Sequence, residues 1–131
     1  MLVRSIATLL VAVSLAGCGT KDPSVTLEWR DHPDLGQILT DGAGLTLYIF
    51  TNDEGSQSTC YGDCAVNWPP LLEASPTAAA DVAGELGTTT RDGGGVQVTY
   101  DGQPLYYFQN DAAPGDANGQ GVGGIWFVIE A

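Results

Sequence analysis

TLYIFTND, residues 46–53, and PLYYFQND, residues 104–111, place the pattern Leu-Tyr-x-Phe-x-Asn-Asp twice in a chain of 131 residues. A constant offset of 58 residues relates the copies, and the same offset relates Trp68 to Trp126. A register that continues without a gap from the motif to a tryptophan indicates a duplicated structural unit. Two copies are fewer than a solenoid needs. We therefore expect one compact domain with pseudo-twofold symmetry.

Each copy of the repeat is predicted to be a β-hairpin whose second strand carries the motif, because strand-like residues flank a glycine-containing turn. The predicted hairpin strands are residues 37–40 and 45–50 in the first copy, and 96–100 and 104–108 in the second. The other predicted elements are strands at 25–29 and 125–129 and a helical turn at 63–67 capped by Asp63. The expected fold class is mainly β: a single compact antiparallel β domain built from two pseudo-symmetric hairpin repeats, with little helix.

The motif strands carry apolar side chains on both faces. Successive side chains of a strand point to opposite sides, so Tyr48 and Phe50 share one face, as do Tyr106 and Phe108. The opposite face carries Leu47, Ile49, Leu105 and Tyr107. Strands of this kind usually lie in the middle of a sheet or between two layers. We therefore expect both motif strands to be central.

The chain opens with a segment that resembles the signal sequence of a bacterial lipoprotein. Arg4 precedes a short apolar stretch at residues 6–15, and the sequence Leu-Ala-Gly-Cys then ends at Cys18. Small residues directly before a cysteine are what lipoprotein processing requires, so we expect cleavage before Cys18 and lipid on its thiol. Two other interpretations remain open: an ordinary signal peptide with an incidental cysteine, and an amino-terminal anchor that stays uncut.

The lipid interpretation sets the expected domain organisation and location. The predicted segments are a signal peptide at 1–17, a lipidated tether at 18–24 and a two-repeat β domain at 25–131, with the first repeat at about 36–72, a linker at 73–84 and the second repeat at about 85–131. Several acyl chains on one residue give stable anchoring. We expect the protein to lie outside the cytoplasm, anchored to the cell membrane or an outer membrane. Its expected partner is that membrane, which it binds through the lipid on Cys18.

The charge balance is strongly acidic. The chain has 16 Asp and Glu against 4 Lys and Arg, which gives a formal net charge of −12. Because nucleic acid is bound through positive side chains that neutralise phosphates, this balance argues against a nucleic-acid partner. It argues equally against electrostatic docking on anionic lipid.

Cys60 and Cys64 form a pair once Cys18 is set aside for lipid. Outside the cytoplasm such a pair favours a disulfide, here one that closes a short loop before Trp68. Two alternatives remain: a redox-active thiol pair, although its spacing is not the usual C-x-x-C, and a metal site, although too few Cys and His residues are present for zinc.

Asp53 and Asp111 end the two motif copies. We expect each carboxylate to accept backbone hydrogen bonds from the loop that follows and so to hold the exit of the strand. The alternative is a site for a hard cation, because the loops are rich in oxygen ligands. The second loop offers the candidate ligands Asp111, Asp116, Asn118 and Gln120, and the first loop offers Asp53, Glu54 and Asp63.

Most of the chain is similar in sequence to a known family. The segments that carry the similarity are TDGAGLTLYIFTND, CYGDCAVNWPPLL, VTYDGQPLYYFQND and PGDANGQGVGGIWFVI, together with the Leu-Ala-Gly-Cys sequence ending at Cys18, which we call the lipobox. The chain resembles small bacterial and archaeal lipoproteins described as a secreted repeat of unknown function, with a Tyr-x-aromatic-x-x-Asp motif. The resemblance implies an envelope lipoprotein, and no biochemical activity comes with it. We expect a structural or binding module rather than an enzyme, with no cofactor. The alternative is a redox or metal-handling module that uses the thiol pair or the acidic loops.

Overall fold

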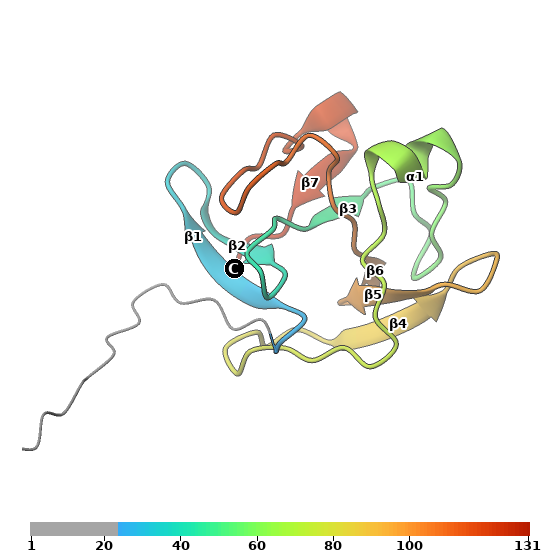
Figure 1. The fold of residues 1–131 in the computed structure, drawn as a ribbon, viewed down its shortest axis with the longest axis horizontal. Coiled ribbons are helices and arrows are strands. Elements are labelled where there is room, and N and C mark those ends of the chain that lie inside the picture. Colours follow the sequence, from blue (N-terminus) through green and yellow to red (C-terminus); the bar gives the residue numbers. More distant parts are fainter. Residues whose placement is uncertain (1–23) are drawn as a thin grey trace, which may run out of the picture.

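The computed structural model describes residues 24–131, so the predicted signal peptide at 1–17, Cys18 and the tether before Ser24 lie outside the described residues. The elements are β1 (Glu28–His32), β2 (Gly36–Thr40), β3 (Tyr48–Phe50), α1 (Asp63–Asn67), β4 (Leu86–Thr90), β5 (Val96–Tyr100), β6 (Gln103–Pro104), the 3₁₀ turn η1 (Val122–Gly124) and β7 (Trp126–Val128). The fold is mainly antiparallel β, as the sequence predicts (Figure 1). In this part of the chain no helix has the length and apolar character needed to cross a membrane.

The two repeats exchange strands. β1 pairs with β2, and β4 pairs with β5, which pairs with β6. β3 of the first repeat, however, pairs with β7 of the second, with Tyr48 opposite Val128 and Phe50 opposite Trp126. The reciprocal contact is present, because the segment around Tyr106 forms an antiparallel bridge with Pro70 of the first repeat. Each motif strand is therefore flanked by the segment that follows the tryptophan of the other repeat.

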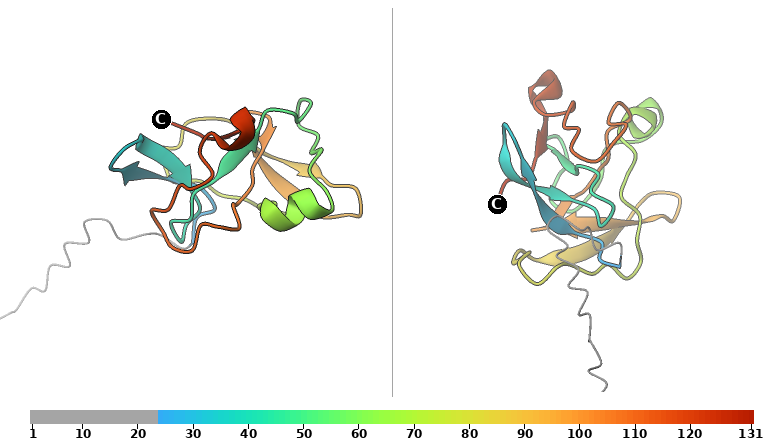
Figure 2. Two further views of the ribbon diagram at one scale, coloured as in Figure 1. Left: turned by 90° about the horizontal axis from the view of Figure 1, so that it is seen from above. Right: turned by 60° about the vertical axis from the view of Figure 1, so that its left-hand side comes forward.

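Tyr48 and Tyr106 lie side by side at the centre of this exchange. The Tyr48 N–H donates to the carbonyl of Tyr106 at 2.8 Å, and the Tyr106 N–H donates to the carbonyl of Tyr48 at 3.0 Å. Tyr48 and Tyr106 are equivalent positions of the two repeats and bond each other reciprocally, so the pseudo-twofold axis passes between them. The β1–β2 hairpin lies at one end of the domain and α1 at the other (Figures 1 and 2).

The two faces of the motif strands pack into two different clusters. The first, which we call the aliphatic core, contains Leu27, Leu39, Leu47, Leu71, Val82, Val98, Tyr100 and Leu105. The second, the aromatic core, contains Ile38, Tyr48, Cys60, Trp68, Tyr106, Trp126 and Val128, with Phe50 and Phe108 packed against it. The alternation expected from the sequence is thus confirmed: neighbouring motif residues face different cores.

Two local predictions at the start of elements are wrong. The first strand is not at residues 25–29 but at Glu28–His32, because the backbone before it pairs with the linker: the N–H groups of Thr26 and Leu27 both donate to the carbonyl of Thr77. The helical turn at Asp63–Asn67 exists, but Gly62 occupies its N-cap position and no side chain caps it. Asp63 is the first helical residue, where a carboxylate still interacts favourably with the helix dipole.

The second motif strand is shorter than the predicted 104–108, because its hydrogen bonds go to three different segments. The N–H of Leu105 donates to Val98, that of Tyr106 to Tyr48 and that of Tyr107 to Pro69. No continuous ladder with one partner forms, so the regular strand β6 ends at Pro104. The segment is nevertheless central, as expected, since Leu105 and Tyr106 are completely buried.

Candidate functional site

The two motifs share one geometry, a pair of crossed tyrosine–aspartate hydrogen bonds. The Tyr106 hydroxyl donates to Oδ2 of Asp53 at 2.6 Å. The Tyr48 hydroxyl donates to Oδ2 of Asp111 at 2.5 Å. Each aspartate therefore binds the tyrosine of the other repeat, and we call these the crossed pairs. Both tyrosine side chains are fully buried.

The second oxygen of each aspartate holds the loop that follows its motif. Oδ1 of Asp53 accepts the backbone N–H of Thr59 at 2.8 Å and its hydroxyl at 2.9 Å. Oδ1 of Asp111 accepts the backbone N–H of Asn118 at 2.9 Å. These backbone bonds are the arrangement expected from the sequence, whereas the tyrosine bonds were not predicted. The aspartates thus tie the strand exit of one repeat to the motif of the other.

Burial raises the pKa of both tyrosines in the crossed pairs. Loss of water around the hydroxyl disfavours the phenolate, and the hydrogen bond to Asp111 or Asp53 raises the pKa of Tyr48 or Tyr106 further. Tyr107, whose hydroxyl donates to Oδ2 of Asp41 at 2.8 Å, has a raised pKa for the same reasons. The three phenols therefore stay neutral well into the alkaline range.

A four-ring aromatic stack lies directly against the crossed pairs. Its order is Phe50, Trp126, Trp68 and Phe108, with ring centroids separated by 4.1, 3.9 and 4.2 Å. The two indoles are parallel within 1° and come from the two repeats. Their exposed fractions are 6% for Trp68 and 4% for Trp126. The order is unchanged when the repeats are exchanged, so the indole pair lies on the pseudo-twofold axis.

Gly119 closes the stack on one side. A Cβ at this position would lie 2.7 Å from the Trp68 ring and 2.9 Å from the Tyr48 ring. The Gly119 N–H donates to the Tyr48 hydroxyl at 3.1 Å. Only glycine allows the backbone this close to both rings.

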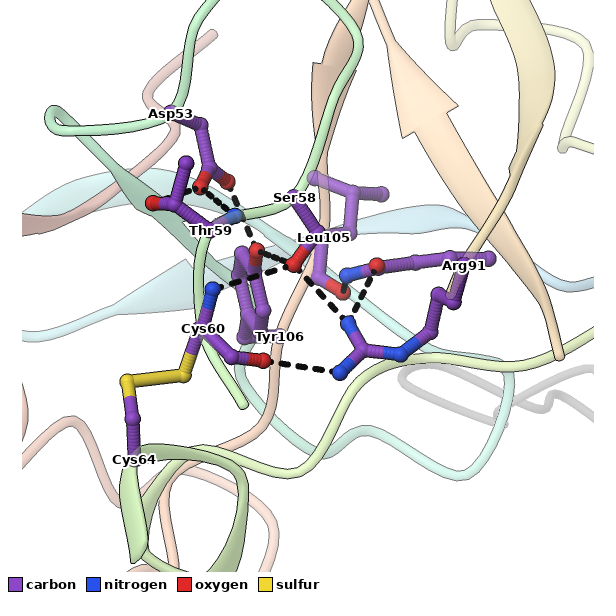
Figure 3. The surroundings of a disulfide bond; sticks show 9 residues. Asp53, Ser58, Thr59, Cys60, Cys64, Arg91, Leu105 and Tyr106 are labelled. Atoms are coloured by element: carbon purple, nitrogen blue, oxygen red, sulfur yellow. Dashed lines mark hydrogen bonds between the residues drawn. A yellow bond between two sulfur atoms is a disulfide. The ribbon is translucent and has the colours of Figure 1, made fainter. Parts of the chain in front are cut away.

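Arg91 breaks the symmetry of the site (Figure 3). Its guanidinium is buried, donates to Ser58 Oγ at 2.9 Å and to the Cys60 carbonyl at 2.7 Å, and lies over the Tyr61 ring. Ser58 Oγ in turn is 2.7 Å from the Tyr106 hydroxyl. Arg91 is not among the site residues predicted from the sequence. The available signal was its charge, because the chain has only 4 Lys and Arg residues against 16 Asp and Glu.

Cys60 and Cys64 form the disulfide predicted from the sequence, with sulfur atoms 2.08 Å apart. The bridge joins the Arg91 network to the first turn of α1 (Figure 3). The Trp68 N–H donates to the Cys64 carbonyl at 2.7 Å. The disulfide therefore fixes the segment that delivers Trp68 to the aromatic stack.

The acidic loops do not gather into a cation site. Among residues 24–131 no group of three or more His, Cys, Asp or Glu side chains is placed to hold a metal ion. Oδ2 of Asp116 accepts the backbone N–H groups of Ala112 and Ala113. The Asn118 side chain donates to the Asn110 carbonyl. With Asp111 bound to Tyr48, these candidate ligands hold the loop itself.

Two clefts flank the crossed pairs at positions related by the repeat. The larger, of about 380 Å³, is lined by Phe50, Thr51, Asp53, Gly55, Ser56, Asp101, Gly102 and Gln103. The smaller, of about 110 Å³, is lined by Leu45, Thr46, Tyr107, Phe108 and Asp111. Phe50 and Asp53 in the first correspond to Phe108 and Asp111 in the second. The two repeats thus build a larger and a smaller version of the same cleft, and we call the larger one the open cleft.

The free energy of unfolding is expected to fall as the pH rises above about 10, the ordinary pKa of tyrosine. Above that pH the unfolded chain loses phenol protons that the folded protein keeps, so the unfolded state binds fewer protons and stability decreases. Urea denaturation at a series of pH values measures the slope. The double variant Tyr48→Phe/Tyr106→Phe should have a shallower slope than the parent protein, because it lacks two of the phenols whose pKa is raised by folding. Equal slopes for the two proteins would contradict this prediction.

Asp53→Ala and Asp111→Ala are each expected to destabilise the fold by about 1–3 kcal/mol, because each leaves a buried tyrosine hydroxyl and a loop amide without their acceptor. In a domain of this size each kcal/mol lowers the Tm by about 4 °C or more. Thermal melts should show the same decrease in Tm for each aspartate variant whether calcium or a chelator is present. The exposed Asp92→Ala serves as control. A wild-type Tm that falls with chelator, and mutants that lose this response, would instead make the aspartates metal ligands.

Comparison with known proteins gives one family match. The sequence model of a family described as "Secreted repeat of unknown function" matches residues 30–72 and 87–130, which together make up more than half of the chain. The two matched segments coincide with the two structural repeats, each ending after its tryptophan. No curated protein and no solved structure matches the chain.

Proposed function

The chain belongs to the family of secreted repeats of unknown function, and from this premise we propose that it is a binding module of the cell envelope, held at the outer side of a membrane by lipid on Cys18. The proposed organisation is a signal peptide at 1–17, a tether at 18–24 and the two-repeat domain at 25–131. The family description supports a location outside the cytoplasm, and the Cys60–Cys64 disulfide is in keeping with an oxidising compartment. The lipobox sequence supports the anchor.

The observation that carries the binding proposal is the open cleft. Its counterpart in the other repeat has less than a third of its volume, although both are built around equivalent aromatic and aspartate side chains. In the open cleft, Phe50 offers an apolar face, while Ser56, Asp101 and Gln103 offer hydroxyl, carboxylate and amide groups. Pockets that combine an apolar wall with a few polar groups are typical of small-molecule sites.

The charges around the open cleft select the class of ligand. Asp53 and Asp101 line it, and the chain as a whole carries a formal net charge of −12. An anionic ligand would be repelled. We propose a small neutral or cationic polar molecule, or an extended segment of a polar polymer, with one apolar face that packs on Phe50.

Photo-crosslinking in the native envelope tests this proposal. A benzophenone amino acid at Ser56, in the open cleft, should give a discrete adduct detectable by mass spectrometry of the purified protein. The matched control is the same amino acid at Ser75, an exposed linker residue that does not line the cleft. Adducts that are absent at position 56, or identical at the two positions, would overturn the binding proposal.

A further inference from the structure

The aromatic stack and the crossed pairs together form a connected set of oxidisable side chains. Tyr48 lies edge-on to Trp68 with centroids 5.3 Å apart, and Tyr106 lies edge-on to Trp126 at 5.1 Å. The two indoles are 3.9 Å apart. Indole and phenol are the aromatic side chains that give up one electron most readily. Four such groups are thus in continuous contact across the pseudo-twofold axis.

The surroundings of the indole pair favour a one-electron step over chemical attack on the rings. Two parallel indoles in contact share the positive charge that remains when an electron is lost. Phe50 and Phe108, which are far harder to oxidise, cover the outer faces of the pair. Trp68 and Trp126 are almost completely buried, so water and dissolved oxygen have little access to the rings.

The crossed pairs supply the proton acceptor that phenol oxidation needs. A tyrosine that loses an electron becomes a strong acid and must release its hydroxyl proton. Asp53 and Asp111 accept that hydrogen bond already, at 2.6 and 2.5 Å from the two hydroxyl oxygens. The proton therefore needs to move only along an existing hydrogen bond, with no water involved.

We propose that the aromatic core is a radical relay, in which an oxidising equivalent received by the Trp68–Trp126 pair passes to Tyr48 or Tyr106 as the phenol proton moves to the paired aspartate. This activity goes beyond the binding function proposed above. In the first step an external one-electron oxidant, such as a peroxyl or carbonate radical, takes one electron from the indole pair. The oxidant is reduced, and an indole radical cation remains.

The second step restores the indole. The tyrosine gives one electron to the radical cation and its proton to the aspartate, and the products are neutral indole, a neutral tyrosyl radical and a neutral carboxylic acid. A one-electron donor such as a thiolate or ascorbate closes the cycle by reducing the tyrosyl radical, which takes its proton back from the aspartate. Electrons and protons balance, and no side chain is consumed.

Electrostatics distinguishes the two ends of the relay. The transfer converts a tyrosine–aspartate pair of charge −1 into a neutral pair, so a nearby cation opposes it and a nearby anion favours it. Arg91 reaches Tyr106 through Ser58, whereas the carboxylate of Asp116 acts on Tyr48. The long-lived radical is therefore expected on Tyr48.

Flash-quench oxidation of the purified full chain by a photo-generated ruthenium(III) complex tests the relay. Transient absorption should show an indole radical that decays into a tyrosyl radical, and electron paramagnetic resonance of the trapped state should identify that tyrosyl. Tyr48→Phe should move the tyrosyl to Tyr106, and Tyr48→Phe/Tyr106→Phe should lengthen the lifetime of the indole radical by about tenfold or more, equivalent to about 1.4 kcal/mol in the barrier.

Tyr107→Phe is the matched control, because it removes a partly buried tyrosine–aspartate hydrogen bond outside the aromatic stack. Its indole radical should decay at the wild-type rate. Asp53→Asn/Asp111→Asn keeps an acceptor but removes the base, and it should also prolong the indole radical. An unchanged lifetime in the double phenylalanine variant, or a tyrosyl radical found on Tyr61 in the wild type, would overturn the proposal. Since the phenylalanine variants lose only hydroxyl groups, this test does not depend on the aspartate variants folding.

Discussion

Trp68→Ala is expected to lower the free energy of unfolding by about 3–5 kcal/mol, the range for removing a buried tryptophan. The indole contacts Trp126 on one face and Phe108 on the other, and the edge of Tyr48 packs against it. Its loss opens a cavity at the centre of the exchange between repeats. Trp126→Ala, at the equivalent position, should have an effect of similar size. Denaturant unfolding followed by far-ultraviolet circular dichroism measures both.

Trp29→Ala is the control for the tryptophan variants. Trp29 is half-buried, lies outside the stack and has one aromatic partner, Tyr100. Trp29→Ala should lower the free energy of unfolding clearly less than Trp68→Ala or Trp126→Ala does. Typical domains are stable by only about 5–15 kcal/mol, so the alanine variants come close to unfolding the protein. The milder substitutions Trp68→Phe and Trp126→Phe keep it folded, and a double-mutant cycle of these two variants measures the coupling between the indoles. If Trp68→Ala costs no more than Trp29→Ala, the stack does not hold the repeats together.

Cys18→Ser is expected to abolish membrane attachment, so that the protein is found in the soluble fraction or accumulates as an uncleaved precursor. The reason is chemical: serine has no thiol to carry the diacylglycerol, and the apolar stretch at 6–15 is short for a membrane span. Fractionation and mass spectrometry of the amino terminus measure the result. Processing of the parent protein should stop when globomycin inhibits the lipoprotein signal peptidase.

Thr20→Ser, two residues after the proposed lipid site, is the control and should remain membrane-bound. A Cys18→Ser protein that is cleaved and anchored like its parent would refute lipid attachment at this residue. The ordinary-signal-peptide and uncut-anchor interpretations would then separate by the mass of the amino-terminal peptide.

Part of the local structure of the repeats was predictable, because short-range patterns determine it. Asp101 and Gly102 have φ values of 50° and 79°, as a two-residue hairpin turn requires, and the Asp-Gly sequence indicates that turn directly. Likewise, the alternation along residues 47–50 and 105–108 assigns each side chain to the aliphatic or the aromatic core. Both inferences depend only on neighbouring residues.

The exchange between repeats was not predictable, because the sequence pattern is the same with or without it. Asp53 would carry the same local signal whether it bound Tyr48 of its own motif or Tyr106 of the other, and the structure selects Tyr106. The pairing of β3 with β7 is equally invisible to a pattern of period two. The sequence identified the repeated residues as important and offered the backbone role of the aspartates, but the tyrosine partners and Arg91 came only from the structure.

The strand exchange also has a consequence for the order of events during synthesis and export. β3 finds its ladder partner β7 only after some eighty further residues have been made, and the first repeat alone lacks both Trp126 and the hydroxyl that Asp53 binds. Contacts of such long sequence separation make folding slow, because loop-closure entropy is lost before they form. We therefore expect that a nascent chain lacking β7 forms no stable half-folded domain. A secreted protein benefits from this delay, since a chain that stays unfolded until its last strand emerges remains threadable through a translocation channel.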